Sequence, residues 1–193
     1  MKAHRISLLT LVLAALVAGC GIREQEREYR NFFNQTAKEL VPGLRLPDES
    51  QYGPAWAFIE GQGWETRDGS GETKAEFWTS GEFNGDEATD YAYILVDEES
   101  EARNLIAFVS ATDGYRYRAE QLTTGFEWGI WLRTRASGRY MATPSGEGAA
   151  DVSPTTQFEV RNQAIDLFET GGSTVTFVWD ESSQAFNRYS VSD

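Results

Sequence analysis

Residues 91–96 read "YAYILV" and directly follow the acidic stretch "EFNGDEATD" at 82–90. Every residue from Tyr91 to Val96 is aromatic or aliphatic, so an extended chain here is apolar on both sides. Strands with this pattern are usually covered on both faces, whereas strands with one wet face alternate. The stretch therefore predicts a central strand, entered from a turn that contains Asn, Gly and Asp.

Similar short stretches, separated by Gly, Asp, Asn or Ser, occupy most of the chain after residue 52. They are rich in aromatic and β-branched residues, as strands are. In "TVTFVW" at 174–179, alternation places Val175, Phe177 and Trp179 on one side. The other stretches are "AWAFIE" (55–60), "AEFWTSGEF" (75–83), "NLIAFVSA" (104–111), "GYRYRAEQL" (114–122), "GIWLRTR" (129–135), "TQFEV" (156–160), "AIDLFE" (164–169) and "FNRYSV" (186–191). Together they predict a mainly β fold, a single antiparallel β-rich domain over 44–193 with one N-terminal amphipathic helix.

The connections between these stretches are of two kinds. Residues 111–114, 170–172 and 180–184 are short and polar, as hairpin turns are. Residues 141–156 are longer and rich in Gly, Ala, Ser and Pro, which predicts a surface loop.

The first 19 residues have the parts of a secretory signal peptide. Lys2 and Arg5 precede an apolar run at 6–17, and small residues lead to Cys20. The run is shorter than the ~20 residues that span a bilayer. "LVAGC" at 16–20 resembles the lipobox of bacterial lipoproteins, which implies that Cys20 is the lipidated first residue of the mature chain. Because Gly21 rather than Asp follows, the resemblance implies a lipid anchor in the outer membrane of the bacterial envelope; the alternative is an ordinary signal with an unrelated cysteine.

Residues 20–43 form the predicted anchored segment and helix. Apolar residues recur there at the three-and-four spacing of an amphipathic helix, namely Tyr29, Phe32, Phe33, Ala37 and Leu40. Pro42 and Gly43 end this pattern. The polar face is mixed in charge and not Lys/Arg-rich, which disfavours the alternative of a helix lying on the membrane.

Charge excludes one class of partner. Without residues 1–19, which carry two basic and no acidic residues, the chain has 15 Lys and Arg against 30 Asp and Glu, a net charge of −15. Such a surface repels phosphate backbones, so nucleic acid is not an expected partner, whereas cations and basic proteins are admissible.

Missing residue types exclude several chemistries. The one histidine, His4, lies in the signal segment, and the one cysteine is Cys20. Ser-His and Cys-His catalysis and His- or Cys-ligated zinc are therefore excluded in the mature chain. No glycine-rich phosphate loop with a following lysine is present. These absences predict a protein that is not an enzyme.

The acidic stretch before the central strand predicts a cation site. Oxygen ligands at alternate positions of a tight loop can converge on one calcium ion. The candidate ligands are Glu82, Asn84, Asp86, the carbonyl of Ala88, and Asp90. The alternatives are a loop of the same geometry without metal, and a plain solvated turn.

"GEFNGDEATDYAYILV" resembles the calcium loop of FG-GAP or VCBS-type, integrin-like proteins, which has the pattern D-x-(D/N)-G-D-G-x-x-D before an apolar strand. The matching positions are Asn84, Gly85, Asp86 and Asp90. Glu82 stands in place of the first aspartate and Glu87 in place of the second glycine. The resemblance implies calcium as the only expected cofactor, in a small β-rich secreted or anchored protein.

Trp131 and Arg133 fall on the same side of their predicted strand and form a candidate ligand surface. We therefore predict a non-enzymatic binding or structural module, anchored through Cys20, with a protein or glycan partner in the envelope. One alternative is a carbohydrate-binding or glycosidase-like protein that uses tryptophan and paired carboxylates. Another is an acidic inhibitor of a basic enzyme such as lysozyme, in which the acidic turn 97–101 protrudes.

Overall fold

The computed structural model describes residues 27–48, 77–111, 116–125, 131–142, 156–168 and 174–191. The chain divides into two compact units, residues 1–39 and 40–193. The predicted fold class is confirmed, because the structure is mostly antiparallel β-sheet with one short helix near the N-terminus. The predicted signal peptide, Cys20 and the stretch 55–60 lie outside the described residues. Among the residues that are described, no helix is long and apolar enough to cross a membrane.

The helix near the N-terminus covers residues 27–40 and contains a π-helical turn. After α-helical residues 27–32 come the π-helix η1 (Phe33–Ala37) and α2 (Lys38–Leu40). Tyr29, Phe33 and Ala37 are buried at the predicted spacing. Leu40, predicted to join them, is 40% exposed. A π-helical turn takes more residues than an α-helical one, so it shifts the residues that follow out of the apolar stripe.

The first sheet is built around the predicted central strand. Its strands are β1 (Leu44–Arg45), β2 (Trp78–Gly81), β3 (Asp90–Asp97), β4 (Arg103–Ser110) and β5 (Tyr117–Thr124). β3 pairs with β4 along one edge and with β1 and β2 along the other, and all these pairs are antiparallel. Residues 90–96 are all buried, which confirms a central strand that is covered on both faces.

The second sheet has the order β11-β10-β9-β6, and a separate hairpin joins β7 to β8. The strands are β6 (Trp131–Arg135), β7 (Gly138–Ala142), β8 (Thr156–Val160), β9 (Ala164–Phe168), β10 (Thr174–Asp180) and β11 (Ala185–Val191). β10 and β11 pair residue for residue from Thr174↔Val191 to Asp180↔Ala185, which confirms the predicted hairpin turn at 180–184.

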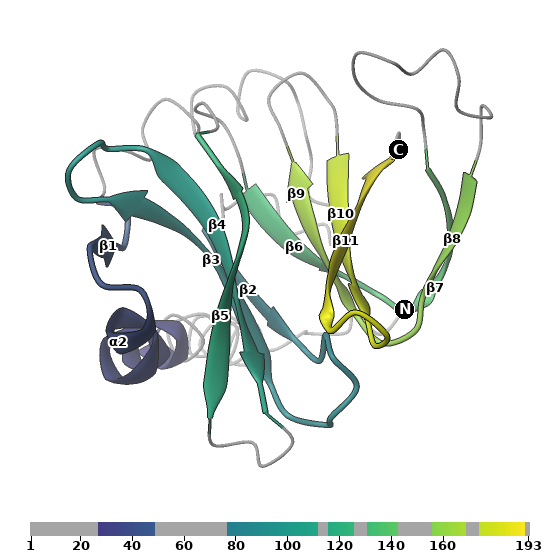
Figure 1. Ribbon diagram of the computed structural model, residues 1–193, viewed down its shortest axis with the longest axis horizontal. Helices are drawn as coiled ribbons and strands as arrows, with labels where there is room; N and C mark the ends of the chain where they lie inside the picture. Colours follow the sequence, from purple (N-terminus) through teal and green to yellow (C-terminus); the bar gives the residue numbers. More distant parts are fainter. Residues whose placement is uncertain are drawn as a thin grey trace, which may run out of the picture. The chain divides into compact units, whose positions relative to one another are not determined.

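The two larger sheets enclose the main core, as Figure 1 shows for β3 and β4 against β9 and β10. The core consists of Phe77, Phe83, Ala92, Ile94, Leu105, Ala107, Val109, Leu132, Ile165, Leu167, Val175 and Phe177. The predicted inward side of residues 174–179 is therefore confirmed, and Trp179 packs against this core while partly exposed. The hydroxyls of Thr79 and Thr134, 2.6 Å apart, join the sheets directly.

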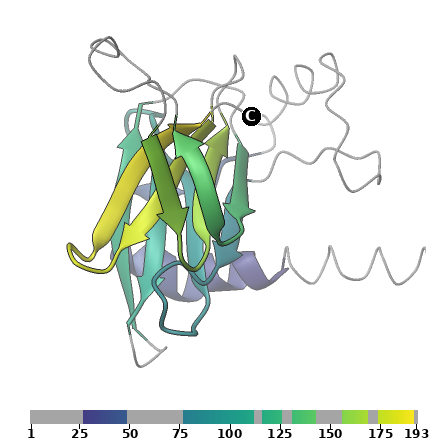
Figure 2. The same ribbon diagram turned by 90° about the vertical axis from the view of Figure 1, so that its right-hand side faces the viewer.

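The β7–β8 hairpin covers the other face of the second sheet (Figure 2). Phe158 and Val160 of β8 form a smaller core there with Ala164, Val178 and Val191. β7 was not predicted, and residues 141–142, which the sequence analysis assigned to a loop, belong to this strand. A strand of five residues next to a stretch rich in Gly and Ser carries too little periodicity to be recognised.

Candidate functional site

Turns from both larger sheets and from the hairpin meet at one end of the sandwich, along the lower edge in Figure 1. They are 82–89 between β2 and β3, 161–163 between β8 and β9, and 181–184 between β10 and β11. The backbone N–H of Glu82 donates to Oε1 of Gln163 at 2.8 Å, and the N–H of Gln163 donates to the carbonyl of Glu82 at 3.0 Å. Arg118 of β5 donates to the carbonyl of Gln184 at 2.6 Å. The turns at this end are therefore connected to one another and to β5 by hydrogen bonds.

Asp90 organises the first of these turns. It is fully buried, and one carboxylate oxygen accepts the backbone N–H groups of Phe83, at 2.7 Å, and Asn84, at 3.2 Å. The other accepts the backbone N–H and the hydroxyl of Ser110, both at 2.7 Å. Burial raises the pKa of Asp90, and these hydrogen bonds oppose the rise. One side chain therefore fixes both ends of the turn 82–89 to the end of β4.

The hydroxyl of Ser110 also links Asp90 to Asp86. Its oxygen lies 3.0 Å from each carboxylate oxygen of Asp86, as well as 2.7 Å from Asp90. A serine hydroxyl has a single proton to donate. The two carboxylates therefore compete for one donor.

The remaining predicted ligands fold the turn back on itself. Oε1 of Glu82 accepts the backbone N–H groups of Gly85 and, at 3.1 Å, of Asp86. Oδ1 of Asn84 accepts the same Asp86 N–H at 3.1 Å, and Oδ1 of Asp86 accepts the N–H of Ala88 at 2.9 Å. The backbone N–H groups of Gly85, Asp86 and Ala88 thus donate to side-chain oxygens of the turn and not to main-chain carbonyls.

Two residues of the turn have left-handed backbone conformations. Gly85 has a φ of 86°, and a Cβ there would lie 2.9 Å from Nδ2 of Asn162. Glu87, which stands where the calcium-loop pattern has glycine, has a φ of 67°. The chain therefore takes the glycine-type conformation at this position despite the side chain, which costs of order 1 kcal/mol.

These contacts bear on the calcium prediction. The oxygens of Asp90 already accept four hydrogen bonds, so in this arrangement N–H and O–H donors occupy the directions from which a cation would approach. In the part of the chain that the structure describes, no three acidic residues are grouped as metal ligands. Oxygens of Glu82, Asn84 and Asp86 also accept hydrogen bonds within the turn, and calcium binding stays a prediction.

The candidate surface of Trp131 and Arg133 lies elsewhere, on the face of the second sheet that the hairpin covers. Both side chains lie against Phe168: the Trp131 ring stacks on it at 4.8 Å, and the Arg133 guanidinium lies 4.7 Å from its ring centre. Arg133 also contacts Asp166 at 3.0 Å. The structure brings the two predicted residues together and leaves the Arg133 side chain 53% exposed.

In the acidic turn 97–101, two of the carboxylates bind donors within the protein. Asp97 accepts hydrogen bonds from the backbone N–H of Ser100 at 2.8 Å and from its hydroxyl at 2.8 Å, which lower the pKa of Asp97. Glu101 forms an ion pair with Arg45 at 2.7 Å. Glu98 and Glu99 are exposed.

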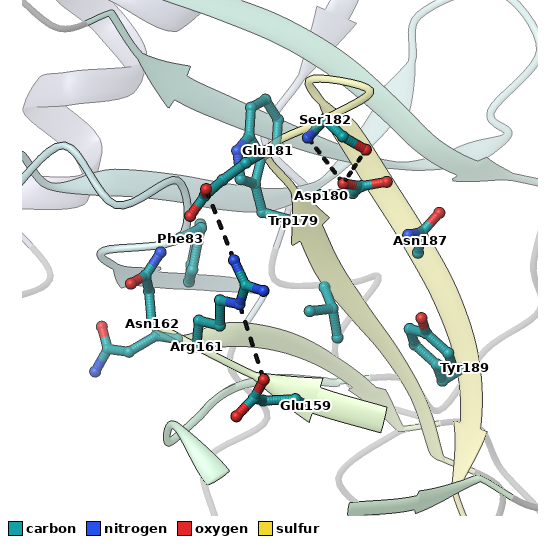
Figure 3. A pocket seen from close by; sticks show the side chains of 12 residues that line it. Phe83, Glu159, Arg161, Asn162, Trp179, Asp180, Glu181, Ser182, Asn187 and Tyr189 are labelled. Atoms are coloured by element: carbon teal, nitrogen blue, oxygen red, sulfur yellow. Dashed lines mark hydrogen bonds and ion pairs between the residues drawn. The ribbon is translucent and has the colours of Figure 1, made fainter. Parts of the chain in front are cut away.

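A cavity of about 600 Å³ opens at the loop end, and sequence reasoning missed it. Figure 3 shows Arg161 reaching between Glu159 and Glu181, at 3.8 Å from each carboxylate. Asn187 and Tyr189 follow each other along β11 on its wall. The lining residues are Phe83, Glu159, Arg161, Asn162, Gln163, Val178, Trp179, Asp180, Glu181, Ser182, Asn187 and Tyr189.

A second cavity of about 580 Å³ shares Trp179 with the first. Its wall includes Asn84, Gly85, Asp86, Arg116, Tyr117, Arg118 and Gln184. The Trp179 ring is held by the Arg118 guanidinium, 5.3 Å from the ring centre, and by an edge contact with Phe186 at 5.2 Å. The predicted turn 82–90 thus borders a cavity.

Comparison with known proteins gives no match. No protein-family model matches the chain, and no curated protein or solved structure is similar to it at a significant level.

Asp180, which lines the first cavity, is suited to accept hydrogen bonds. Hydrogen bonds from Ser182 and then from Ser183 lower the pKa of Asp180 to about 2. Asp180 is therefore ionised at every physiological pH. A general acid needs a raised pKa, so this residue is suited to bind a donor rather than to deliver a proton.

Proposed function

We propose that this protein is a non-enzymatic binding module of the bacterial cell envelope, held at the outer membrane by a lipid on Cys20. The ligand site that we propose is the cavity lined by Trp179, Asp180, Asn187 and Tyr189. Below it is called the Trp179 cavity.

One observation carries the proposal: loops from several strands meet at one end of the sandwich and border a cavity of about 600 Å³. Ligand sites are typically concave, of ~300 to 1,000 Å³, and combine aromatic walls with a few polar groups. They also lie disproportionately on loops that a rigid scaffold positions. The hydrogen bonds between Glu82 and Gln163 and from Arg118 to Gln184 supply that rigidity.

The chemistry of the cavity favours binding over catalysis. Glu159 and Glu181 both face the guanidinium of Arg161, and the pKa of Asp180 is lowered to about 2. Glycoside hydrolysis requires one carboxyl group that stays protonated as the general acid. The lowered pKa of Asp180 opposes that state for this carboxylate of the cavity.

The anchor is tested by labelling cells with a radioactive fatty acid and separating membrane from soluble fractions. We expect wild-type protein to carry the label and to sediment with the outer membrane, and Cys20→Ser to lose both properties. Unlabelled wild-type protein in the soluble periplasmic fraction would contradict the anchor.

The binding site is tested by a fragment screen on the purified protein, read from the indole N–H signal of Trp179 and the side-chain amide signal of Asn187. We expect some polar fragments to shift both signals. If a broad screen moves neither, the cavity is not a ligand site and the binding function is refuted.

A further inference from the structure

We propose that the ligand of the Trp179 cavity is a neutral saccharide, which binds through its ring faces and hydroxyl groups. This inference rests on the proposed function and adds the chemical class of the ligand. The charge of the cavity, its polar groups and its aromatic walls support this class of ligand.

Charge excludes anionic ligands from this cavity. Three carboxylates line it, those of Glu159, Asp180 and Glu181, against the single guanidinium of Arg161. The whole chain is also acidic, at −13. Phosphates, uronic acids and sulfated glycans would meet net repulsion, because like charges placed together cost binding free energy.

The polar groups match hydroxyls, which both donate and accept. Asn162, Gln163 and Asn187 each carry an amide that donates through nitrogen and accepts through oxygen. Asp180 adds an ionised acceptor and Arg161 a fixed set of donors. A saccharide presents hydroxyls that can bond to both kinds of group beside the partners they already have, whereas an apolar ligand would only remove them from water.

Arg161 is held loosely enough to turn to a ligand. Its guanidinium lies 3.8 Å from Glu159 and 3.8 Å from Glu181, beyond the usual hydrogen-bond distance, and its side chain is 70% exposed. Exposed ion pairs of this kind contribute little to stability. A hydroxyl can therefore replace either contact at small cost.

Aromatic side chains supply the apolar surface that sugar rings require. Tyr189 is fixed by stacking on Phe158, with ring centres 4.2 Å apart and planes 3° from parallel. Trp179 is fixed by Arg118 and Phe186 and stays partly exposed. Both rings are oriented before a ligand arrives, which reduces the entropic cost of binding. The C–H faces of a sugar ring can pack on such surfaces while its hydroxyls reach the amides.

The test is a titration of the purified protein with a panel of tetrasaccharides, followed by calorimetry and by the NMR signals of Trp179 and Asn187. The neutral members are maltotetraose, cellotetraose, mannotetraose and tetra-N-acetylchitotetraose. Tetragalacturonate is the anionic probe and fully deacetylated chitotetraose is the cationic one. We expect saturable binding of at least one neutral member and no binding of tetragalacturonate.

Variants assign the binding to this cavity. We expect Asn187→Ala and Arg161→Ala, both at exposed positions that leave the core intact, each to weaken the neutral saccharide about tenfold. Asn34→Ala, an exposed asparagine of the N-terminal helix, is the matched control and should leave binding unchanged.

Three results overturn the inference: no binding by any neutral member, binding only by a charged probe, or neutral binding that both cavity variants leave unchanged. If fragments shift Trp179 and Asn187 but no neutral saccharide does, the inference fails and the proposed binding function stands. If fragments and saccharides both leave these signals unmoved, the proposed function fails as well.

Discussion

Replacing Asp90 by alanine tests the reading of the turn 82–89 as a hydrogen-bonded structural unit. The substitution removes the acceptor of three backbone N–H groups, those of Phe83, Asn84 and Ser110. The bonds to Phe83 and Ser110 are buried, so water cannot replace the carboxylate without entering the structure. The Ser110 hydroxyl can still turn to Asp86, 3.0 Å away.

The expected cost follows from these contacts. Leaving one buried N–H without an acceptor costs about 1 to 3 kcal/mol. Two such groups give a loss of about 2 to 6 kcal/mol. The substitution also removes the cost of burying the Asp90 carboxylate, the cost that raises its pKa, so the net loss is smaller. We expect Asp90→Ala to lower the free energy of unfolding by about 3 kcal/mol. For a domain of this size that corresponds to a fall in Tm of about 6 to 12 °C.

The assay is urea unfolding of the purified protein, followed by tryptophan fluorescence, with the slope m fitted for each variant. Asp97→Ala is the matched control, because Asp97 accepts the same kinds of turn hydrogen bond but lies at the surface. We expect a much smaller loss for this control. If Asp90→Ala stays within about 1 kcal/mol of wild type at an unchanged m, Asp90 does not hold the turn.

The other predictions concern pH, the buried ion pairs and calcium. Since the folded pKa of Asp90 is raised above 3.8, wild type should lose stability relative to Asp90→Ala as pH rises from about 4 through that folded pKa. For Asp180, whose pKa is lowered, the dependence on pH is opposite. Its contribution to folding stability is complete above pH ~4 and is lost as the pH falls toward about 2, and NMR titration of its carboxyl group measures that pKa. Arg135→Met should cost about 3 kcal/mol, because it removes the buried partner of Asp166 at 2.6 Å. Arg133→Met, at the half-exposed partner, should cost under about 1 kcal/mol in the same urea assay, and equal losses would contradict this assignment. Calcium binding at 82–90 requires that calcium raise Tm and that Asp86→Ala abolish the rise; an unchanged wild-type Tm would remove the calcium prediction.

Local pattern was enough to place most of the described strands. The stretches predicted as strands at 91–96 and 104–111 correspond to β3 and β4 to within one residue at each end, and β3 is buried as predicted. Alternation likewise placed Val175 and Phe177 in the core. β7 could not be placed, because its five residues gain their apolar face only from pairing with β8 and from packing on Val178 and Val191.

The candidate site was predicted only in part. Spacing along the chain singled out Asp86 and Asp90, and the structure brings both to one point. The group they share is Ser110, which is 20 residues from Asp90 along the chain, and nothing in the local sequence indicates this contact. The Trp179 cavity is harder still to foresee, because its walls combine residues from Phe83 to Tyr189 that only the sheet order brings together.

Among the described residues, two aspartates are fully buried, and both have structural roles that their neighbours in the sequence do not indicate. Asp90 accepts four hydrogen bonds at the end of the first sheet, and Asp166 accepts Arg135, Arg133 and Thr176 on the covered face of the second. Both stand beside apolar residues in sequence, where alternation alone assigns a carboxylate to a solvated face. Instead each is retained in the interior by donors from other strands, because a buried charge is tolerated only when it is paired. Other carboxylates stay accessible at the surface, such as Asp180 at the end of β10 and Glu181 in the turn after it, and these border the cavity to which we assign binding.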